Sequence, residues 1–167
     1  PQPLTATAIV ASMKACPCER QLIVHGCRCL GAIASVGRAG KAVMVEAGAV
    51  TAIMAAMHAA LERSERPGEY PDFELLQHAA WALGEAAEGF DPGRRALRAA
   101  GGVRALSQVE VACSAEGDSL TELTDACHTT ASWALSTISP GDGIAAWWAG
   151  MLGCMNAGEA SVDAEQL

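Results

Sequence analysis

An internal repeat constrains the fold of this chain more than any other feature of its sequence. Residues 7–13 (TAIVASM) return as TAIMAAM at residues 51–57, an offset of 44, and residues 104–109 (RALSQV) form a looser copy 53 residues after that. The stretch CLGAIA at residues 29–34 is matched by ALGEAA at residues 82–87, again at an offset of 53. Two elements that recur in the same order predict successive copies of one supersecondary unit.

The segments between these elements indicate what the unit contains. Residues 94–103 match residues 41–50, and both stretches contain glycine after an amphipathic segment. Glycine is the residue that most easily adopts the left-handed conformation ending a helix. Residues 131–135 (ASWAL) repeat residues 79–83 (AAWAL) at an offset of 52. Ala-rich stretches with few β-branched runs favour helix over strand. We therefore expect an all-α fold whose unit is a short helix, a glycine corner and two longer helices.

This order of elements resembles the armadillo repeat, which has a short first helix ending in Ala-Gly-Ala, a second helix rich in Leu and a third carrying Trp-Ala-Leu. The resemblance covers roughly residues 4–138 and implies a right-handed α-solenoid of about two and two-thirds repeats. We expect a single domain over residues 1–156. Its members would be a partial repeat at residues 4–36 and repeats at residues 39–88 and 92–138.

A last apolar helix is expected at residues 144–155, followed by an acidic tail at residues 157–167. This helix would cap the solenoid, because terminal repeats have no neighbour on one side. Trp147 and Trp148 are adjacent, so both indoles cannot point the same way on a helix, and one is expected to be exposed or docked. The alternative role of the helix is therefore to dock the protein into a larger complex, including one at a membrane.

The resemblance also implies a binding site. In armadillo proteins the third helices line a concave groove, with Trp shaping pockets and an Asn one turn later that grips a peptide backbone. The equivalent residues here are Arg28, Trp81 and Trp133 at the Trp position and Ala32, Glu85 and Thr137 at the Asn position. None of the last three is Asn, and neither Ala nor ionised Glu can both donate and accept, so backbone recognition of an extended peptide is not expected. Trp81 and Trp133 either bind a partner in another mode or fill the core.

Charge is distributed unevenly along the chain. All 11 Lys and Arg residues lie at or before Arg104, so residues 105–167 contain nine acids and no basic residue. The negative electrostatic field of this segment would attract a protein partner with a basic surface or segment and would repel nucleic acid. A role in solubility alone would also explain the uneven charge. Arg94, Arg95 and Arg98 form a cluster without interleaved aromatic residues, which we interpret as a solvated face rather than a nucleic-acid site.

Four cysteines raise the possibility of a zinc site: Cys16, Cys18, Cys27 and Cys29. However, Cys27 and Cys29 are two positions apart on an expected helix, about 200° around its axis, so they cannot both face one ion. We interpret them as packing residues and expect no metal and no cofactor. The odd total of seven cysteines, in a chain long enough to bury a core, favours reduced thiols and an intracellular, cytoplasmic protein.

No catalytic signature stands out. The chain lacks a phosphate-binding loop, a zinc-protease His-Glu pair and a nucleophile elbow, and the neighbours Cys127 and His128 would diverge on a helix. His25 and His78 occupy equivalent repeat positions, which explains their recurrence without chemistry. There is also no secretory leader and no apolar run of about 20 residues, with an organellar location the alternative if a targeting segment has been removed. We therefore expect a soluble, non-catalytic scaffold for protein binding, with a structural subunit of a large complex as the alternative.

Overall fold

The computed structural model describes residues 3–64, 66, 69–115 and 122–138. Within these ranges the protein has eight helices and no strand, and 86% of the residues are helical. The expected all-α class is therefore confirmed. The segments for which we expected a capping helix and an acidic tail, with Trp147 and Trp148, lie outside the described residues.

The eight helices follow one another closely along the chain. Their bounds are α1 Pro3–Ala15, α2 Arg20–Ser35, α3 Arg38–Glu46, α4 Ala49–Ser64, α5 Phe73–Ala87, α6 Asp91–Ala99, α7 Gly102–Ala115 and α8 Glu122–Ile138. Short helices of nine residues, α3 and α6, thus each precede two longer ones. This is the order of helix lengths that the sequence repeat predicts.

Two glycines make the corners between the short helices and the helices that follow. Gly48 has φ 72° between α3 and α4, and Gly101 has φ 79° between α6 and α7, so both adopt the left-handed conformation that side chains disfavour. Their amides donate to the carbonyls of Val45 and Arg98, in each case at 3.0 Å. The predicted glycine corners are confirmed, because these hydrogen bonds close the last turn of each short helix.

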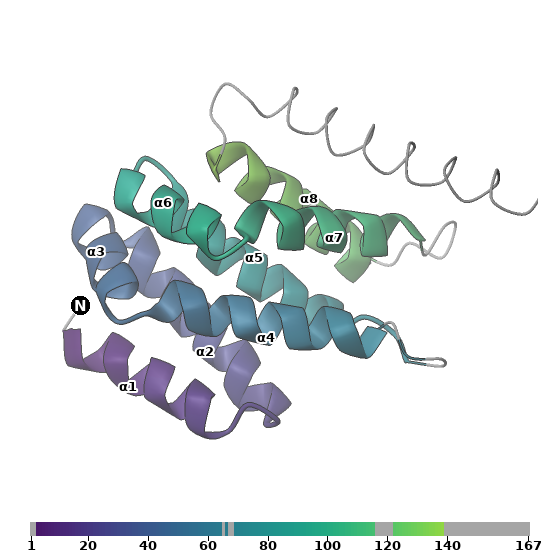
Figure 1. Cartoon of the computed structure of the whole chain (residues 1–167), viewed down its shortest axis with the longest axis horizontal. Coiled ribbons are helices and arrows are strands. Elements are labelled where there is room, and N and C mark those ends of the chain that lie inside the picture. Colours follow the sequence, from purple (N-terminus) through teal and green to yellow (C-terminus); the bar gives the residue numbers. More distant parts are fainter. Residues whose placement is uncertain (1–2, 65, 67–68, 116–121, 139–167) are drawn as a thin grey trace, which may run out of the picture.

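The long helices form two layers in which the same order recurs (Figure 1). In one layer α2 packs against α5 and α5 packs against α8. In the other layer α1 contacts α4 and α4 contacts α7, while the short helices α3 and α6 contact each other at one end. Each element therefore lies beside the element with which it shares a sequence pattern.

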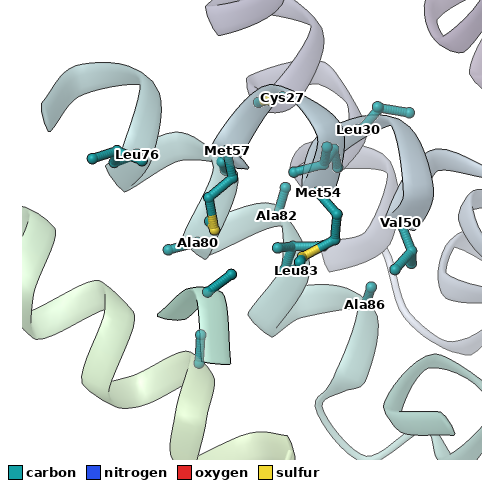
Figure 2. Close-up of a cluster of buried hydrophobic side chains, with 14 of the residues drawn as sticks. Cys27, Leu30, Val50, Met54, Met57, Leu76, Ala80, Ala82, Leu83 and Ala86 are labelled. Atoms are coloured by element: carbon teal, nitrogen blue, oxygen red, sulfur yellow. The ribbon is translucent and has the colours of Figure 1, made fainter. Parts of the chain in front are cut away.

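One continuous hydrophobic cluster lies between the layers and extends from Ala6 in α1 to Ile138 in α8. Figure 2 shows its centre, where Met54 and Met57 of α4 lie close to Ala80 and Leu83 of α5. Small residues of α5 let the helices approach closely, and Met fills the irregular spaces that remain. The core therefore has no boundary that would divide the described helices into separately packed groups.

Candidate binding face

The five residues that we expected to bind a partner lie on three adjacent helices. Arg28 is exposed on α2, Trp81 and Glu85 are half-buried on α5, and Trp133 and Thr137 are half-buried on α8. Since α5 packs between α2 and α8, these residues belong to one layer, and we call this surface the α2–α5–α8 face. The structure thus brings these five residues onto one layer.

The two tryptophans make the same contact with the preceding helix of this layer. A β-carbon added at Gly31 of α2 would lie 2.4 Å from Cζ3 of Trp81, and one added at Gly84 of α5 would lie 2.3 Å from Cζ3 of Trp133. Both distances are far below van der Waals contact, so only glycine leaves room for the indole rings. Each tryptophan therefore acts as a spacer that sets how closely neighbouring helices of the layer approach.

The remaining residues of the α2–α5–α8 face differ in whether their polar groups are already bonded. The Thr137 hydroxyl donates to the Ala134 carbonyl at 2.7 Å within its own helix. Arg28 and Glu85, by contrast, make no ion pair within the described residues. Of the expected site residues, these two charges are the ones free to pair with a partner.

The histidines at equivalent repeat positions, His25 and His78, lie on the adjacent helices α2 and α5. Burial lowers the pKa of His78 on α5, and the positive charge of Arg28 and the neighbouring His25 on α2 lower it further. Glu74 acts in the opposite direction. The recurrence of histidine at equivalent positions therefore has an electrostatic consequence that sequence reasoning did not anticipate, because adjacent helices bring the equivalent positions into proximity.

Two basic residues bind the carboxyl ends of helices in the α2–α5–α8 layer. Lys41 of α3 is almost buried and donates from Nζ to the Glu88 carbonyl at the end of α5, at 2.7 Å. Arg98 of α6 donates to the Ile138 carbonyl at the end of α8. A cation is favourable there because the last carbonyls of a helix carry partial negative charge. Arg98 is thus more than part of a solvated face, because it bonds the end of α8. Neither bond could be anticipated from the sequence.

The amino ends of α2 and α5 are joined by a three-residue ion network. Arg20 binds Asp72 through Nε at 2.6 Å and Nη2 at 2.8 Å, and the same Nη2 lies 2.7 Å from Glu74. These bonds raise the pKa of the guanidinium group further above its usual range. Asp72 also caps α5, since its Oδ1 accepts from the Leu75 amide at 3.2 Å. One side chain therefore both starts α5 and fixes its position beside α2.

A cavity of about 290 Å³ lies next to this network. Its apolar wall comes from Ile23, Ala56 and Leu75, and Arg63 and the Arg20–Asp72 pair line it as well. The exposed Cys18 lines it too. The cavity thus combines an apolar wall with an ion pair and a thiol.

The cysteines considered for zinc binding separate in the structure. Cys27 is buried in α2, which raises the pKa of its thiol to about 12, whereas Cys29 is exposed. Cys16 and Cys18 are exposed near the end of α1. Across the described ranges no three His, Cys, Asp or Glu side chains gather in a way that could hold a metal ion.

Comparison with known proteins does not assign the chain to a group. No protein-family profile and no curated protein matches the sequence. Among the described helices, none is by itself long and apolar enough to cross a membrane; α3 and α4 reach that length only as a pair, with a bend of 70° between them.

Proposed function

We propose that the chain is an armadillo-type α-solenoid of about two and two-thirds repeats that acts as a non-catalytic protein-binding module. The observation that carries the proposal is the glycine–tryptophan contact, which occurs between α2 and α5 and again between α5 and α8. The same contact at two places, shifted by 52 or 53 residues, is what stacking of one unit by translation requires.

A second pair of contacts supports the same arrangement. A β-carbon at Gly40 would lie 1.8 Å from the Ile33 carbonyl oxygen, and one at Gly93 would lie 1.8 Å from the Ala86 carbonyl oxygen. The two pairs are related by an offset of 53 at both residues. Each short helix thus meets the preceding long helix in the same way, so that successive units would keep one mutual orientation.

The binding role is proposed for the α2–α5–α8 face, which would form the concave side of the solenoid. This face carries two half-buried indoles, and it also carries Arg28 and Glu85, which are unpaired among the described residues. Tryptophan and arginine are the residues that most often dominate binding energy at protein interfaces. We infer a protein partner with a basic surface or segment, because Glu85 on this face and the nine acids of residues 105–167 would favour such a partner.

Charge reversal on this face tests the proposal without disturbing the helix packing. We would capture partners with the wild-type chain, with Arg28→Glu and Glu85→Lys, and with Arg95→Glu as a matched control on the exposed side of α6, and quantify them by mass spectrometry. Replacing Trp81 is a poorer test, because its ring also packs over Gly31.

The expected result is a partner that the wild-type and Arg95→Glu chains recover equally and that Glu85→Lys recovers at least about tenfold less, since losing a central charged contact costs on the order of 2 kcal/mol. Arg28→Glu makes the face more acidic and should recover a basic partner at least as well as the wild type. Circular dichroism confirms that the variants are folded. A partner that Glu85→Lys retains, or that Arg28→Glu loses, would refute the proposed binding surface for a basic partner.

A further inference from the structure

The cavity beside the Arg20–Asp72 pair takes no part in the proposed binding role, because none of the five residues expected to bind a partner lines it. The turn between α1 and α2, the second half of α4 and the starts of α2 and α5 surround it. Its volume of about 290 Å³ is near the lower end of the range of roughly 300 to 1,000 Å³ that ligand pockets span. The cavity is therefore of a size that suits a small molecule.

Small side chains on α4 make the apolar part of the cavity. Ala56 lines it from α4, and the buried side chains of Ile23 and Leu75 line it from α2 and α5. At the offset of 53 that relates α4 to α7, Val109 stands at the position of Ala56 and is fully buried. Alanine at this position thus leaves room that valine fills in α7. The resulting apolar wall favours a ligand with a hydrocarbon body.

One cation that lines the cavity has no partner. The guanidinium group of Arg63 is half-buried and makes no hydrogen bond or ion pair within the described residues. The other cation of the lining, Arg20, is already bound by Asp72 and by Glu74. Since Asp72 is the acid of the lining, the charge in excess is the positive charge of Arg63. A guanidinium group in this position favours a carboxylate, which its planar fork can bind through two parallel hydrogen bonds.

We propose that this cavity binds a small carboxylate with an apolar body, whose carboxylate pairs with Arg63 and whose hydrocarbon chain packs against Ile23, Ala56 and Leu75. The volume sets the size of the ligand. A water molecule takes up about 30 Å³ in the liquid, so the cavity has room for roughly eight to ten non-hydrogen atoms. Octanoate is of this size and has a single negative charge, so it is a suitable probe.

Protection of Cys18 from alkylation tests the proposal, because this exposed thiol lines the cavity, whereas the exposed thiol of Cys29 does not. The reduced full-length chain with Cys16→Ser is treated briefly with iodoacetamide at rising concentrations of octanoate and is then cleaved after Lys and Arg. Residues 15–20 then contain Cys18 alone, and residues 29–38 contain Cys29 alone. We expect octanoate to slow the alkylation of Cys18, with half of the effect at a concentration on the order of 1 mM, and to leave Cys29 unchanged.

Two further probes separate the charge of the ligand from its apolar body. Octylamine has a similar chain with a positive charge, and acetate has the carboxylate without the chain. Both should protect Cys18 with an apparent affinity at least about tenfold lower than that of octanoate. Isothermal titration calorimetry on the same protein measures the dissociation constants directly. Equal protection by octylamine or by acetate would overturn the proposal.

Three variants locate the site. Arg63→Gln should weaken octanoate binding about tenfold, the usual loss when a hydrogen bond between charged groups is removed. Arg95→Gln, on the exposed side of α6, is the matched control and should bind octanoate as well as the parent chain. Ala56→Val introduces the residue that α7 has at the equivalent position, so it is expected to fold and to abolish the protection of Cys18 by filling the cavity.

Circular dichroism confirms that each variant is folded. Full protection in Arg63→Gln or in Ala56→Val would overturn the proposal, as would a parent chain in which about 10 mM octanoate leaves the alkylation of Cys18 unchanged. Equal slowing at Cys29 and Cys18 would show that octanoate acts on the chain as a whole, and would likewise overturn a site in the cavity.

Discussion

The segments α3–α5 and α6–α8 have the same helix order and the same glycine corners, but their middle helices differ on one side. In α4, four apolar residues on this side are buried: Val50, Met54, Met57 and Leu61. At the equivalent positions of α7 the side chains are half-buried or exposed, and three of the four are polar: Val103, Ser107, Glu110 and Ser114. The two helices thus share a register and differ in what surrounds them.

The two helices also differ in the neighbours that the structure describes. α4 lies between α1 and α7, whereas α7 contacts α4 and no further helix of that layer within the described ranges. Glu110 of α7 instead accepts a hydrogen bond from Ser132 of α8. The comparison teaches that two copies in one register can carry an apolar contact in one place and a polar contact in the other.

The largest difference between the two segments is expected at their middle helices. Met54→Ala should lower the free energy of unfolding by about 2 to 4 kcal/mol, because it leaves a cavity in a fully covered side of α4. Ser107→Ala at the equivalent position of α7 should change it by less than about 0.5 kcal/mol. Urea unfolding followed by circular dichroism measures both. Equal effects would remove the distinction between the two helices.

The glycine contacts should show what the two segments share. Gly31→Ala and Gly84→Ala should each lower the free energy of unfolding by about 1 to 3 kcal/mol, since the new methyl group overlaps a tryptophan ring. This loss should exceed the gain of about 1 kcal/mol that alanine brings to a helix. Ser136 occupies the equivalent position in α8, so Ser136→Ala is the control and should change stability by less than about 0.5 kcal/mol. Stabilisation by either glycine variant would contradict the spacer role.

Removing the hydrogen bonds at the carboxyl ends of α5 and α8 should change the free energy of unfolding by an intermediate amount. Lys41→Met should lower the free energy of unfolding by about 1 to 2 kcal/mol, because the Glu88 carbonyl then loses a charged donor at an almost buried site. Arg98→Met should lower it by about 1 kcal/mol or less, since Arg98 is more exposed. Thermal and urea unfolding of both variants measure the difference. A larger loss for Arg98 would reverse the assignment of Lys41 as the better-buried donor.

The smallest effect concerns pH. The pKa of His78 is lowered in the folded protein by burial and by Arg28, from an ordinary value of 6.5. Below about pH 6.5 the unfolded chain therefore binds more protons than the folded chain, so this contribution is fully present above that pH and is lost as the pH falls. The midpoint of thermal unfolding should fall less between pH 7.5 and 5.5 for His78→Gln than for the wild type. His58→Gln on the exposed side of α4 is the control. If the unfolding midpoint of His78→Gln falls between pH 7.5 and 5.5 as much as that of the wild type, the lowered pKa of His78 is contradicted.

Sequence patterns predict the helices and their corners because those depend on local interactions. α1 begins and α2 ends within about one residue of the limits expected for the partial repeat, residues 4 and 36, and Gly48 and Gly101 adopt the conformation that their place after an amphipathic segment predicts. Local signals of this kind require no knowledge of which helices become neighbours.

The contacts between helices were beyond the same reasoning. Trp81 could have filled the core or lined a pocket, and its role as a spacer becomes visible only once Gly31 is opposite the ring. Lys41 resembles any surface lysine in the sequence, since the carbonyl that it binds is 47 residues away. Such details need the relative placement of helices that the repeat alone does not give.

The most direct test of the central claim, that one unit recurs with one contact between neighbours, is a nuclear Overhauser experiment on the tryptophan rings. Trp81→Phe and Trp133→Phe assign the indole signals among the four tryptophans of the chain. The account predicts cross-peaks from the Trp81 ring to the α-protons of Gly31 and from the Trp133 ring to those of Gly84. Rings that show cross-peaks only to their own helices, or a contact for one tryptophan and not the other, would contradict it.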